Sequence, residues 1–186
     1  MNDSKIKLFM DLAGQNYADK FNAEDQEKRK LGAQLLLSEV LEYVIKGLGV
    51  KPVFNGTEIT DANGLDYLAG TKPDKVEMLD GLADVAYTMY WNSVAFGAPL
   101  EQAFELVCDN NLQKFVKLDN WSGKEGSIDS DQWDLGCDTV WPPEVTEVNV
   151  VQISENFYGV GKDKTGKVRK PSQYHSVDLQ PLVANS

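Results

Sequence analysis

Two groups of acidic residues, each inside an apolar segment, are the part of this sequence best suited to metal chemistry. They are Glu39 and Glu42 in LLLSEVLEYV, and Glu77, Asp80 and Asp84 in EMLDGLADVAY. Residues three or four apart share one face of a helix, so each group projects from a single side. Carboxylates buried among apolar residues need cations, and Mg²⁺ and Mn²⁺ prefer oxygen ligands. The pattern predicts a Mg²⁺ or Mn²⁺ site on two helices, although a single acid pair also suits a solvated helix edge.

Other metal sites fit the sequence less well. A di-iron site in a helical bundle needs Glu-x-x-His on two helices, and the chain has one histidine, His175. The same shortage disfavours a zinc site built from histidine. The segment DSDQWD has acidic residues but lacks the glycine and the distal glutamate of an EF-hand loop.

Cationic and amide side chains follow later in the chain. Asn111 and Lys114 lie three apart in DNNLQKF and share a helix face. The tail segment GKDKTGKVRKP holds a basic cluster, namely Lys162, Lys164, Lys167, Arg169 and Lys170. This cluster suits the neutralisation of phosphates in an otherwise acidic protein, and the alternative is an ordinary solvated hairpin.

The elements that must position these residues are mostly helical. Apolar spacing predicts a helix over residues 5–21, and Asn22 caps a second helix that Gly47 and Gly49 end. The further predicted elements are a loop with a short helical turn over 50–72, helices over 73–96 and 99–118, Gly-, Ser- and Pro-rich turns over 120–145, and a small hairpin in the tail. The predicted fold is therefore all-α, a four-helix bundle over residues 1–118, with an insertion and a loop and β-hairpin extension over 119–186.

Composition narrows the classes of partner. With 186 residues the chain suits one domain, and its net charge of −11 disfavours binding to polymeric DNA or RNA. Two cysteines without metal or redox spacing favour a reducing compartment. The start MNDSKIKLFM does not match a signal peptide, and no apolar run suits a membrane span. We therefore expect a cytoplasmic protein.

Four segments, in this order, resemble the all-α nucleoside triphosphate pyrophosphohydrolases, the MazG and phosphoribosyl-ATP pyrophosphohydrolase superfamily. That family carries E-x-x-E on one helix and E-x-x-D on the next; Glu39 and Glu42 match the first pair, and LADVAY makes Asp84 the aspartate. Gly81 stands where the family has glutamate, so Asp80 or Glu77 would substitute. NNLQKF is similar to the SNMSKF of phage members, and GKVRKPSQYHSVDL to their GKVxKPxxYxxPDL, with Val177 in place of the proline.

The resemblance covers residues 30–118 and 159–180 and implies roles for individual residues. It implies two or three Mg²⁺ or Mn²⁺ ions on Glu39, Glu42, Asp80, Asp84 and Glu77. It implies hydrolysis of a nucleoside triphosphate to monophosphate and pyrophosphate, with Glu39, Glu42 and Lys114 as catalytic residues. The expected substrate contacts in these ranges are Asn111, Lys114, Lys162, Lys167, Lys170 and Tyr174. Side-chain chemistry, rather than the resemblance, adds Gln15 and Asn16, whose amides can read a base edge, and Trp91, whose ring can flank a base.

The resemblance also bears on the substrate and on assembly. It is compatible with the MazZ-type phage enzymes, which convert dGTP to dGMP, and with a homodimer or homotetramer. Alternatives are a dUTPase- or dCTPase-like enzyme, a phosphoribosyl-ATP pyrophosphohydrolase, or an acidic helical module that binds a partner through its Trp- and Pro-rich insertion.

Overall fold

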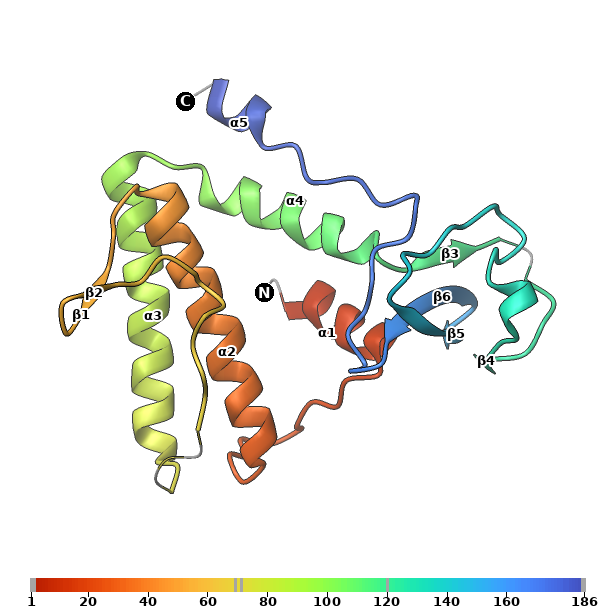
Figure 1. Cartoon of the computed structure of the whole chain (residues 1–186), viewed down its shortest axis with the longest axis horizontal. Helices are drawn as coiled ribbons and strands as arrows, with labels where there is room; N and C mark the ends of the chain where they lie inside the picture. Colours follow the sequence, from red (N-terminus) through yellow and green to blue (C-terminus); the bar gives the residue numbers. More distant parts are fainter. Residues whose placement is uncertain (1–2, 69, 71, 120, 185–186) are drawn as a thin grey trace. The chain divides into compact units, whose positions relative to one another are not determined.

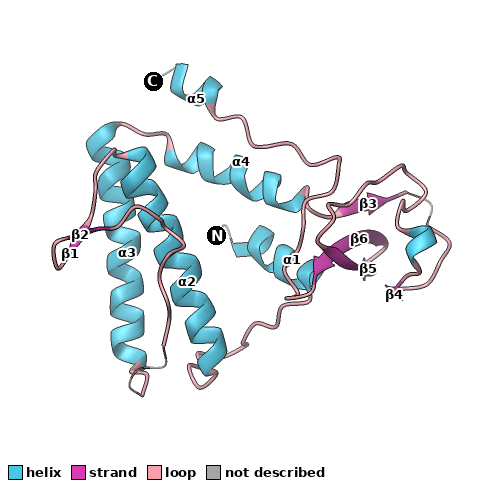
Figure 2. Cartoon of the chain, viewed as in Figure 1, coloured by secondary structure: helices cyan, strands magenta, loops and turns pink. Residues whose placement is uncertain are grey.

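A computed structural model describes residues 3–68, 70, 72–119 and 121–184 of the chain. The fold is mixed: 42% of the structure is helical and 15% is strand, with helices beside two antiparallel sheets (Figures 1 and 2). The predicted all-α class is therefore wrong. The chain divides into two compact units, one formed by Met1–Tyr17 with Tyr87–Ser186 and the other by Ala18–Ala86.

The unit of residues 18–86 contains both groups of acidic residues that the sequence suggests as metal ligands. Its first helix, α2, spans Gln26–Glu42 and continues directly into a π-helical turn, η1, over Tyr43–Gly47. Asp25 caps α2, because its carboxylate accepts a hydrogen bond from the Lys28 amide at 2.9 Å. The observed cap therefore lies three residues after the predicted cap, Asn22, and the helix ends near the predicted glycines.

The predicted loop after η1 contains a short hairpin. Strands β1, Val53–Phe54, and β2, Thr57–Glu58, pair in antiparallel fashion. Asn55 and Gly56 form the turn with positive φ, as a two-residue hairpin loop requires. The helical turn predicted nearby is not formed among the described residues of DANGLDYLAG, in which residue 69 is not described.

The two following helices match the predicted order. Helix α3 spans Lys75–Phe96, and the Asp74 carboxylate accepts hydrogen bonds from the amides of its first turn. Gly97, at φ +66°, ends it as predicted. Helix α4 spans Leu100–Leu112, shorter than predicted, because residues 116–118 form a strand instead.

A four-stranded antiparallel sheet occupies the later part of the chain, in the order β3-β6-β5-β4. The bounds are β3 Val116–Leu118, β4 Gly126–Ser127, β5 Val145–Ile153 and β6 Asn156–Asp163. The predicted strand segments form β5 and β6, which pair along their length. The hairpin predicted around the KDKTGK turn is reduced to an isolated bridge between Lys162 and Val168. A 3-10 turn, η2, spans Ser130–Gln132, and a terminal helix, α5, spans Gln180–Ala184.

Hydrophobic side chains cover both faces of this sheet. On one face Val148 and Val150 are fully buried with Leu135, and Trp133 and Trp141 pack against them. The other face holds a second set: Leu12, Ala13, Phe115 and Val160. Alternating residues of a strand point to opposite faces, so β5 and β6 serve both cores.

Two glycines of β6 allow side chains of the first core to pack directly against the strand. A Cβ atom added to Gly159 would lie 2.2 Å from Leu135, and one added to Gly161 would lie 2.4 Å from the ring of Trp141. The indole of Trp141 is held by a 2.9 Å hydrogen bond to the carbonyl of Trp133. Trp141 therefore has little freedom to move away.

We expect Gly161→Ala to lower the free energy of unfolding by about 1–3 kcal/mol, the usual cost of overpacking a core. Gly81→Ala is the matched control, because no atom lies within 4 Å of the added Cβ in the middle of α3. It should stabilise the protein by about 0.5–1 kcal/mol through helix propensity. Urea denaturation measures both, and equal effects would contradict the packing assigned to Trp141.

Helix α1 spans Asp3–Ala13 and packs on α4 and on the sheet. The rings of Phe9 and Phe115 meet edge to face, with centroids 5.1 Å apart. Gly14, at φ +68°, ends the helix, so the prediction of a helix to residue 21 is wrong. The helices in the described part of the chain are all too short or too polar to cross a lipid bilayer.

Candidate functional site

The acidic residues of α2 lie at the point where the helix changes geometry. Glu39 and Glu42 occupy the last turn before η1, where Tyr43 accepts a hydrogen bond from the amide of Leu48, five residues on. π-Helical turns are rare and often occur at functional sites. The two carboxylates therefore lie beside a local irregularity of the backbone.

Lys46 in the π-helical turn forms an ion pair with a carboxylate of α2. Its ammonium group binds the Glu42 carboxylate at 2.6 Å. That hydrogen bond is the main cause that raises the pKa of Lys46, and the charges of Glu42, Asp61 and Glu39 add to it. The charge of Asp61, from the loop after β2, thus also acts on Lys46.

Sequence reasoning missed Asp61 because it lies in a turn, outside the helical pattern. Its carboxylate accepts a hydrogen bond from the Asn63 amide at 2.8 Å, which is ordinary turn chemistry. The DANG segment around Asp61 predicts a turn, but it does not indicate which residues lie near Asp61 in the fold.

We expect Lys46→Ala to strengthen binding of Mn²⁺ to the protein. The Lys46 ammonium is exposed and would compete with a divalent ion for Glu42, so its removal should lower the Kd for Mn²⁺ about two- to fivefold. Titration calorimetry measures the change. Lys30→Ala is the control, because Lys30 pairs with Glu27 elsewhere on α2. A weaker affinity in Lys46→Ala would contradict the competition.

The acidic residues of α3 are exposed. Glu77, Asp80 and Asp84 lie on the solvent-accessible surface, and none of the residues of α3 is buried. The expectation that these carboxylates are buried is wrong, because the apolar residues around them are exposed as well. Among the described residues, no three His, Cys, Asp or Glu side chains come together as a metal site. The joint site of α2 and α3 stays a prediction.

The predicted amide and lysine pair of α4 is formed, in the unit that holds the sheet. Lys114 Nζ donates a 2.7 Å hydrogen bond to Asn111 Oδ1 and lies 5.5 Å from the centre of the Phe9 ring. The charge of Lys114 is therefore held by α4 and α1 together. A lysine positioned in this way is suited to contact with an anion.

The tail binds α4 through Asn110, which sequence reasoning missed. Asn110 is buried; its Oδ1 accepts a 2.6 Å hydrogen bond from the Tyr174 hydroxyl, and its amide donates to the His175 carbonyl. Lys170 stacks on the Tyr174 ring at 4.4 Å. The predicted substrate residues Tyr174 and Lys170 are thus brought together, and the Tyr174 hydroxyl is engaged within the protein.

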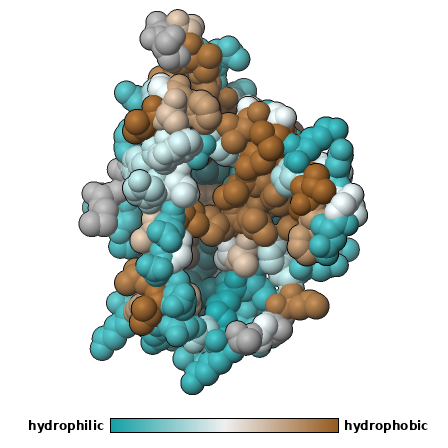
Figure 3. Space-filling view, turned by 90° about the vertical axis from the view of Figure 1, so that its left-hand side faces the viewer, coloured by the Kyte–Doolittle hydropathy of each residue, from teal (hydrophilic) through white to brown (hydrophobic). Residues whose placement is uncertain are grey.

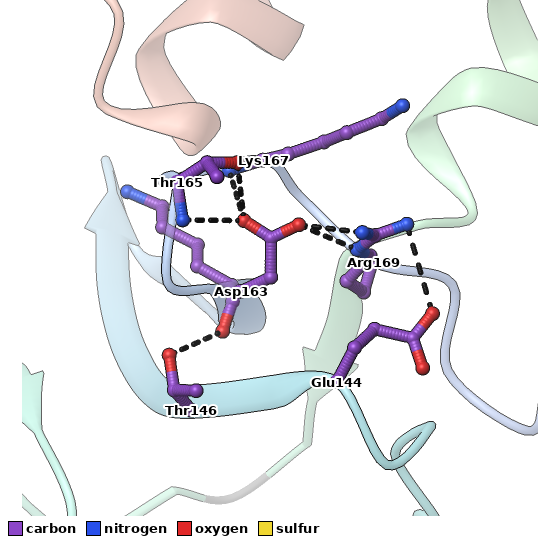
Figure 4. A network of polar contacts seen from close by, with 7 residues as sticks. Glu144, Thr146, Asp163, Thr165, Lys167 and Arg169 are labelled. Atoms are coloured by element: carbon purple, nitrogen blue, oxygen red, sulfur yellow. Dashed lines mark hydrogen bonds and ion pairs between the residues drawn. The ribbon is translucent and has the colours of Figure 1, made fainter.

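The basic turn of the tail is organised by Asp163 (Figure 4). Its carboxylate accepts hydrogen bonds from the Thr165 hydroxyl at 2.6 Å, the Thr165 amide at 2.8 Å and the Lys167 amide at 3.1 Å. Arg169 completes the set with an ion pair at 2.6 Å and also reaches Glu144 at 3.6 Å. Arg169 therefore binds carboxylates within the protein, whereas the sequence placed it in a phosphate-binding cluster.

This network lowers the pKa of Asp163 well below its usual range, chiefly through the Thr165 hydroxyl, with the amides of Thr165 and Lys167 and Arg169 contributing. A depressed folded-state pKa stabilises the fold above the unfolded pKa of about 3.9, and the contribution is lost as pH falls towards the folded-state pKa.

We expect Asp163→Asn to lower the Tm by several degrees at neutral pH. The difference from the wild type should persist down to about pH 4 and shrink at lower pH, where the wild-type advantage titrates away. Thermal denaturation across pH measures it. Asp131→Asn, at an exposed position, serves as the control. A difference that grows as the pH falls would contradict the assigned cause.

Three further predicted substrate residues, Gln15, Asn16 and Trp91, are exposed. Gln15 and Asn16 follow α1 in an exposed segment, and the Gln15 amide bonds to the Met10 carbonyl at 2.8 Å. Trp91 is an exposed residue of α3. All predicted substrate residues belong to the unit of residues 1–17 and 87–186, and all predicted metal ligands to that of residues 18–86.

Comparison with protein-family models, curated proteins and solved structures finds no significant match to this chain.

Proposed function

We propose that the protein is a metal-dependent nucleoside triphosphate pyrophosphohydrolase, which converts a (d)NTP and water to the monophosphate and pyrophosphate. The observation that supports it most is the position of Glu39 and Glu42 in the last turn of α2, where Glu42 binds the Lys46 ammonium at 2.6 Å. A pair of carboxylates that already holds one cationic group suits divalent ions.

The chemistry of these residues fits Mg²⁺ or Mn²⁺. All the candidate ligands are carboxylates, the oxygen donors that hard divalent ions prefer. The Lys46 ammonium marks where positive charge is favourable. When bound, the ions would supply Lewis-acid charge that orients the triphosphate and eases deprotonation of the attacking water. Glu39 and Glu42, with Asp80, Asp84 and Glu77 of α3, are the proposed ligands.

The residues of the chain have distinct proposed roles in the reaction. Glu39 or Glu42 accepts the proton of the water as the water attacks the α-phosphorus. Lys114, held by Asn111, stabilises the negative charge that develops on the departing pyrophosphate. Lys162, Lys167 and Lys170 of the tail extend this positive charge, and Trp91 stacks on the base.

Substrate choice rests on the resemblance to MazZ-type enzymes, which makes dGTP the first substrate we propose. Gln15 and Asn16 are the amides proposed to read the base edge. Discrimination requires polar groups that the wrong base would leave unpaired.

The test is a screen of dGTP, dATP, dCTP, dTTP, dUTP and phosphoribosyl-ATP with Mg²⁺ or Mn²⁺, which resolves monophosphate, diphosphate, pyrophosphate and orthophosphate. We expect monophosphate and pyrophosphate in equal amounts, with the highest kcat/KM for dGTP. Orthophosphate with an accumulating diphosphate would overturn the proposed reaction. A preference for dUTP or dCTP would retain the reaction and overturn the guanine assignment.

The tryptophans of the insertion are used within the protein. Trp121, Trp133 and Trp141 pack against the core of the sheet, and the indole N–H groups of Trp133 and Trp141 donate to backbone carbonyls. Side chains used in this way are less available to a partner. The alternative of an interaction module that binds through these rings is therefore less well supported than the enzyme.

A further inference from the structure

The insertion, residues 119–157, lies outside the segments that resemble the hydrolases, so the proposed function gives it no role. Broad hydrophobic areas are exposed on one face of the molecule (Figure 3), whereas the tryptophans of the insertion are half-buried against the core of the sheet. The insertion is therefore a packed part of the protein, and its contacts with other segments indicate what it does.

One loop of the insertion, residues 134–140 (the insertion loop), is fixed on the sheet. Leu135 is buried in the sheet core at φ +57°, an unusual backbone conformation for a bulky residue. The Thr139 amide closes the loop with a 3.1 Å hydrogen bond to the Asp134 carbonyl. Trp141, directly after the loop, packs against the same core. The insertion loop is therefore held in place at both ends.

The tail of the chain makes a turn over residues 171–174. The Tyr174 amide donates a 3.0 Å hydrogen bond to the Pro171 carbonyl. Lys170 precedes this turn, and its ammonium lies 4.4 Å from the centre of the Tyr174 ring. Residues 170–179 belong to no helix or strand, so individual contacts must hold the turn and Lys170 in position.

The two central residues of the turn bind the insertion loop. The Ser172 amide donates a 2.9 Å hydrogen bond to the Val140 carbonyl, and the Val140 amide donates a 3.0 Å hydrogen bond to the Ser172 hydroxyl. The side-chain amide of Gln173 donates to the Thr139 hydroxyl at 2.8 Å and to the Cys137 carbonyl at 3.4 Å. Thr139 is 5% exposed, so this acceptor is fixed within the protein.

The end of the turn binds α4 at the same time. The buried side chain of Asn110 accepts the hydrogen bond of the Tyr174 hydroxyl and donates to the His175 carbonyl. The turn is therefore held from two directions, by α4 through Tyr174 and by the insertion loop through Ser172 and Gln173. Contacts on both sides fix the ring on which the Lys170 ammonium rests.

We propose that the insertion loop positions the tail for substrate binding, with Thr139 and Gln173 as positioning residues that act through Lys170. This role rests on the proposed function, because Lys170 is one of its phosphate contacts. Lys170 is exposed, so its ammonium is accessible to an anion. A cation that is already held in place loses less conformational freedom when it binds a phosphate, which strengthens binding.

The first test is hydrogen exchange of the tail, measured by NMR, which does not depend on catalytic activity. Gln173→Ala removes the donor to Thr139 from an exposed position, so the protein should stay folded. We expect the Ser172 amide to exchange about two- to tenfold faster, the range that loss of one hydrogen bond covers. Gln180→Ala, at an exposed position further along the tail, is the matched control and should leave this rate unchanged. An unchanged rate in Gln173→Ala would overturn the proposal.

The second test is the affinity for inorganic triphosphate in the presence of Mg²⁺, measured by titration calorimetry. Gln173→Ala should raise the Kd about two- to fivefold, and Lys170→Ala at least as much. In the double variant the two losses should not add, because Gln173 acts through Lys170. A purely structural role would leave the Kd of Gln173→Ala at the wild-type value. That result, or additive losses, would contradict the positioning role.

Substitutions of Thr139 test the other side of the contact. Thr139→Val keeps the shape of the side chain but removes the acceptor of the Gln173 amide, so it should reproduce both effects of Gln173→Ala. Thr139→Ser keeps the hydroxyl and should retain the wild-type exchange rate and Kd. Equal behaviour of the two variants would exclude Thr139 as a positioning residue. If Thr139→Val fails to fold, Gln173→Ala still decides, because Gln173 is exposed.

The two measurements distinguish the positioning role from the hydrolase activity. A wild type that binds inorganic triphosphate, shows the expected losses in Gln173→Ala and hydrolyses no nucleoside triphosphate would overturn the hydrolase and support the positioning role. A wild type that hydrolyses nucleoside triphosphates, with exchange and Kd unchanged in Gln173→Ala, would overturn the positioning role alone.

Discussion

Glu39→Gln is expected to lower kcat for triphosphate hydrolysis about a hundred- to ten-thousandfold, the range that loss of a general base covers. Glutamine keeps the size of the side chain but cannot accept the proton of the attacking water, and it is a weaker ligand for a divalent ion. Glu39 is exposed on α2, so the fold should remain intact. The measurement is steady-state hydrolysis at saturating Mg²⁺, with circular dichroism as a check of folding.

Glu27→Gln is the matched control for this prediction. Glu27 lies in the first turn of the same helix and pairs with Lys30 on the surface. Its substitution removes one negative charge from α2 without touching the group around Lys46, so kcat should stay near the wild-type value. Near-normal turnover in Glu39→Gln would remove Glu39 from the catalytic residues. A comparable loss in both variants would point to net charge rather than to position.

Lys114→Ala is expected to lower kcat/KM about a hundredfold, the effect of removing one group that stabilises developing charge. The structure supports a defined position for this ammonium, since Asn111 holds it at 2.7 Å and the Phe9 ring lies beneath it. Triphosphate binding should weaken more than binding of Mn²⁺, because the charge of Lys114 attracts phosphate and repels cations.

Lys164→Ala is the matched control for the lysine substitution, since Lys164 is exposed in the turn after β6. It should change kcat/KM little beyond the loss of long-range attraction, an effect that disappears at high salt. An equal loss of Mn²⁺ and triphosphate affinity in Lys114→Ala would assign Lys114 a structural role between α1 and α4. Asn111→Ala should reproduce part of the Lys114→Ala effect, because it frees the lysine from its fixed position.

Elements that depend on short-range signals follow the sequence closely. Apolar residues at helical spacing predict α3, and Gly97 marks its end because a residue at positive φ stops the helix. The alternation of β-branched and aromatic residues predicts β5 and β6 in the same way. The pairing of Lys114 with Asn111 also follows from their spacing of three residues, although α4 ends at Leu112 and Lys114 lies in the turn that follows it.

Contacts between segments that are distant in the sequence determined the other features of the fold. The strand β3 follows α4 directly and forms only because β6, about forty residues later, offers it a partner. This pairing ends α4 early and makes the fold mixed. Helical spacing of apolar residues cannot predict such a pairing, because it reports only on neighbours along the chain. Burial behaves in the same way: the apolar residues of α3 predict a buried helix, yet the single chain leaves them exposed.

The sequence by itself determined which residues carry the candidate chemistry and on which helices they lie, because spacing along a helix sets which side chains share a face. Only the tertiary structure decided their neighbours. The charge of Asp61, in a loop, acts on Lys46, and Asp163 takes Arg169 out of the basic cluster. Charge pairs of this kind depend on distance in space, which the order of residues along the chain does not specify.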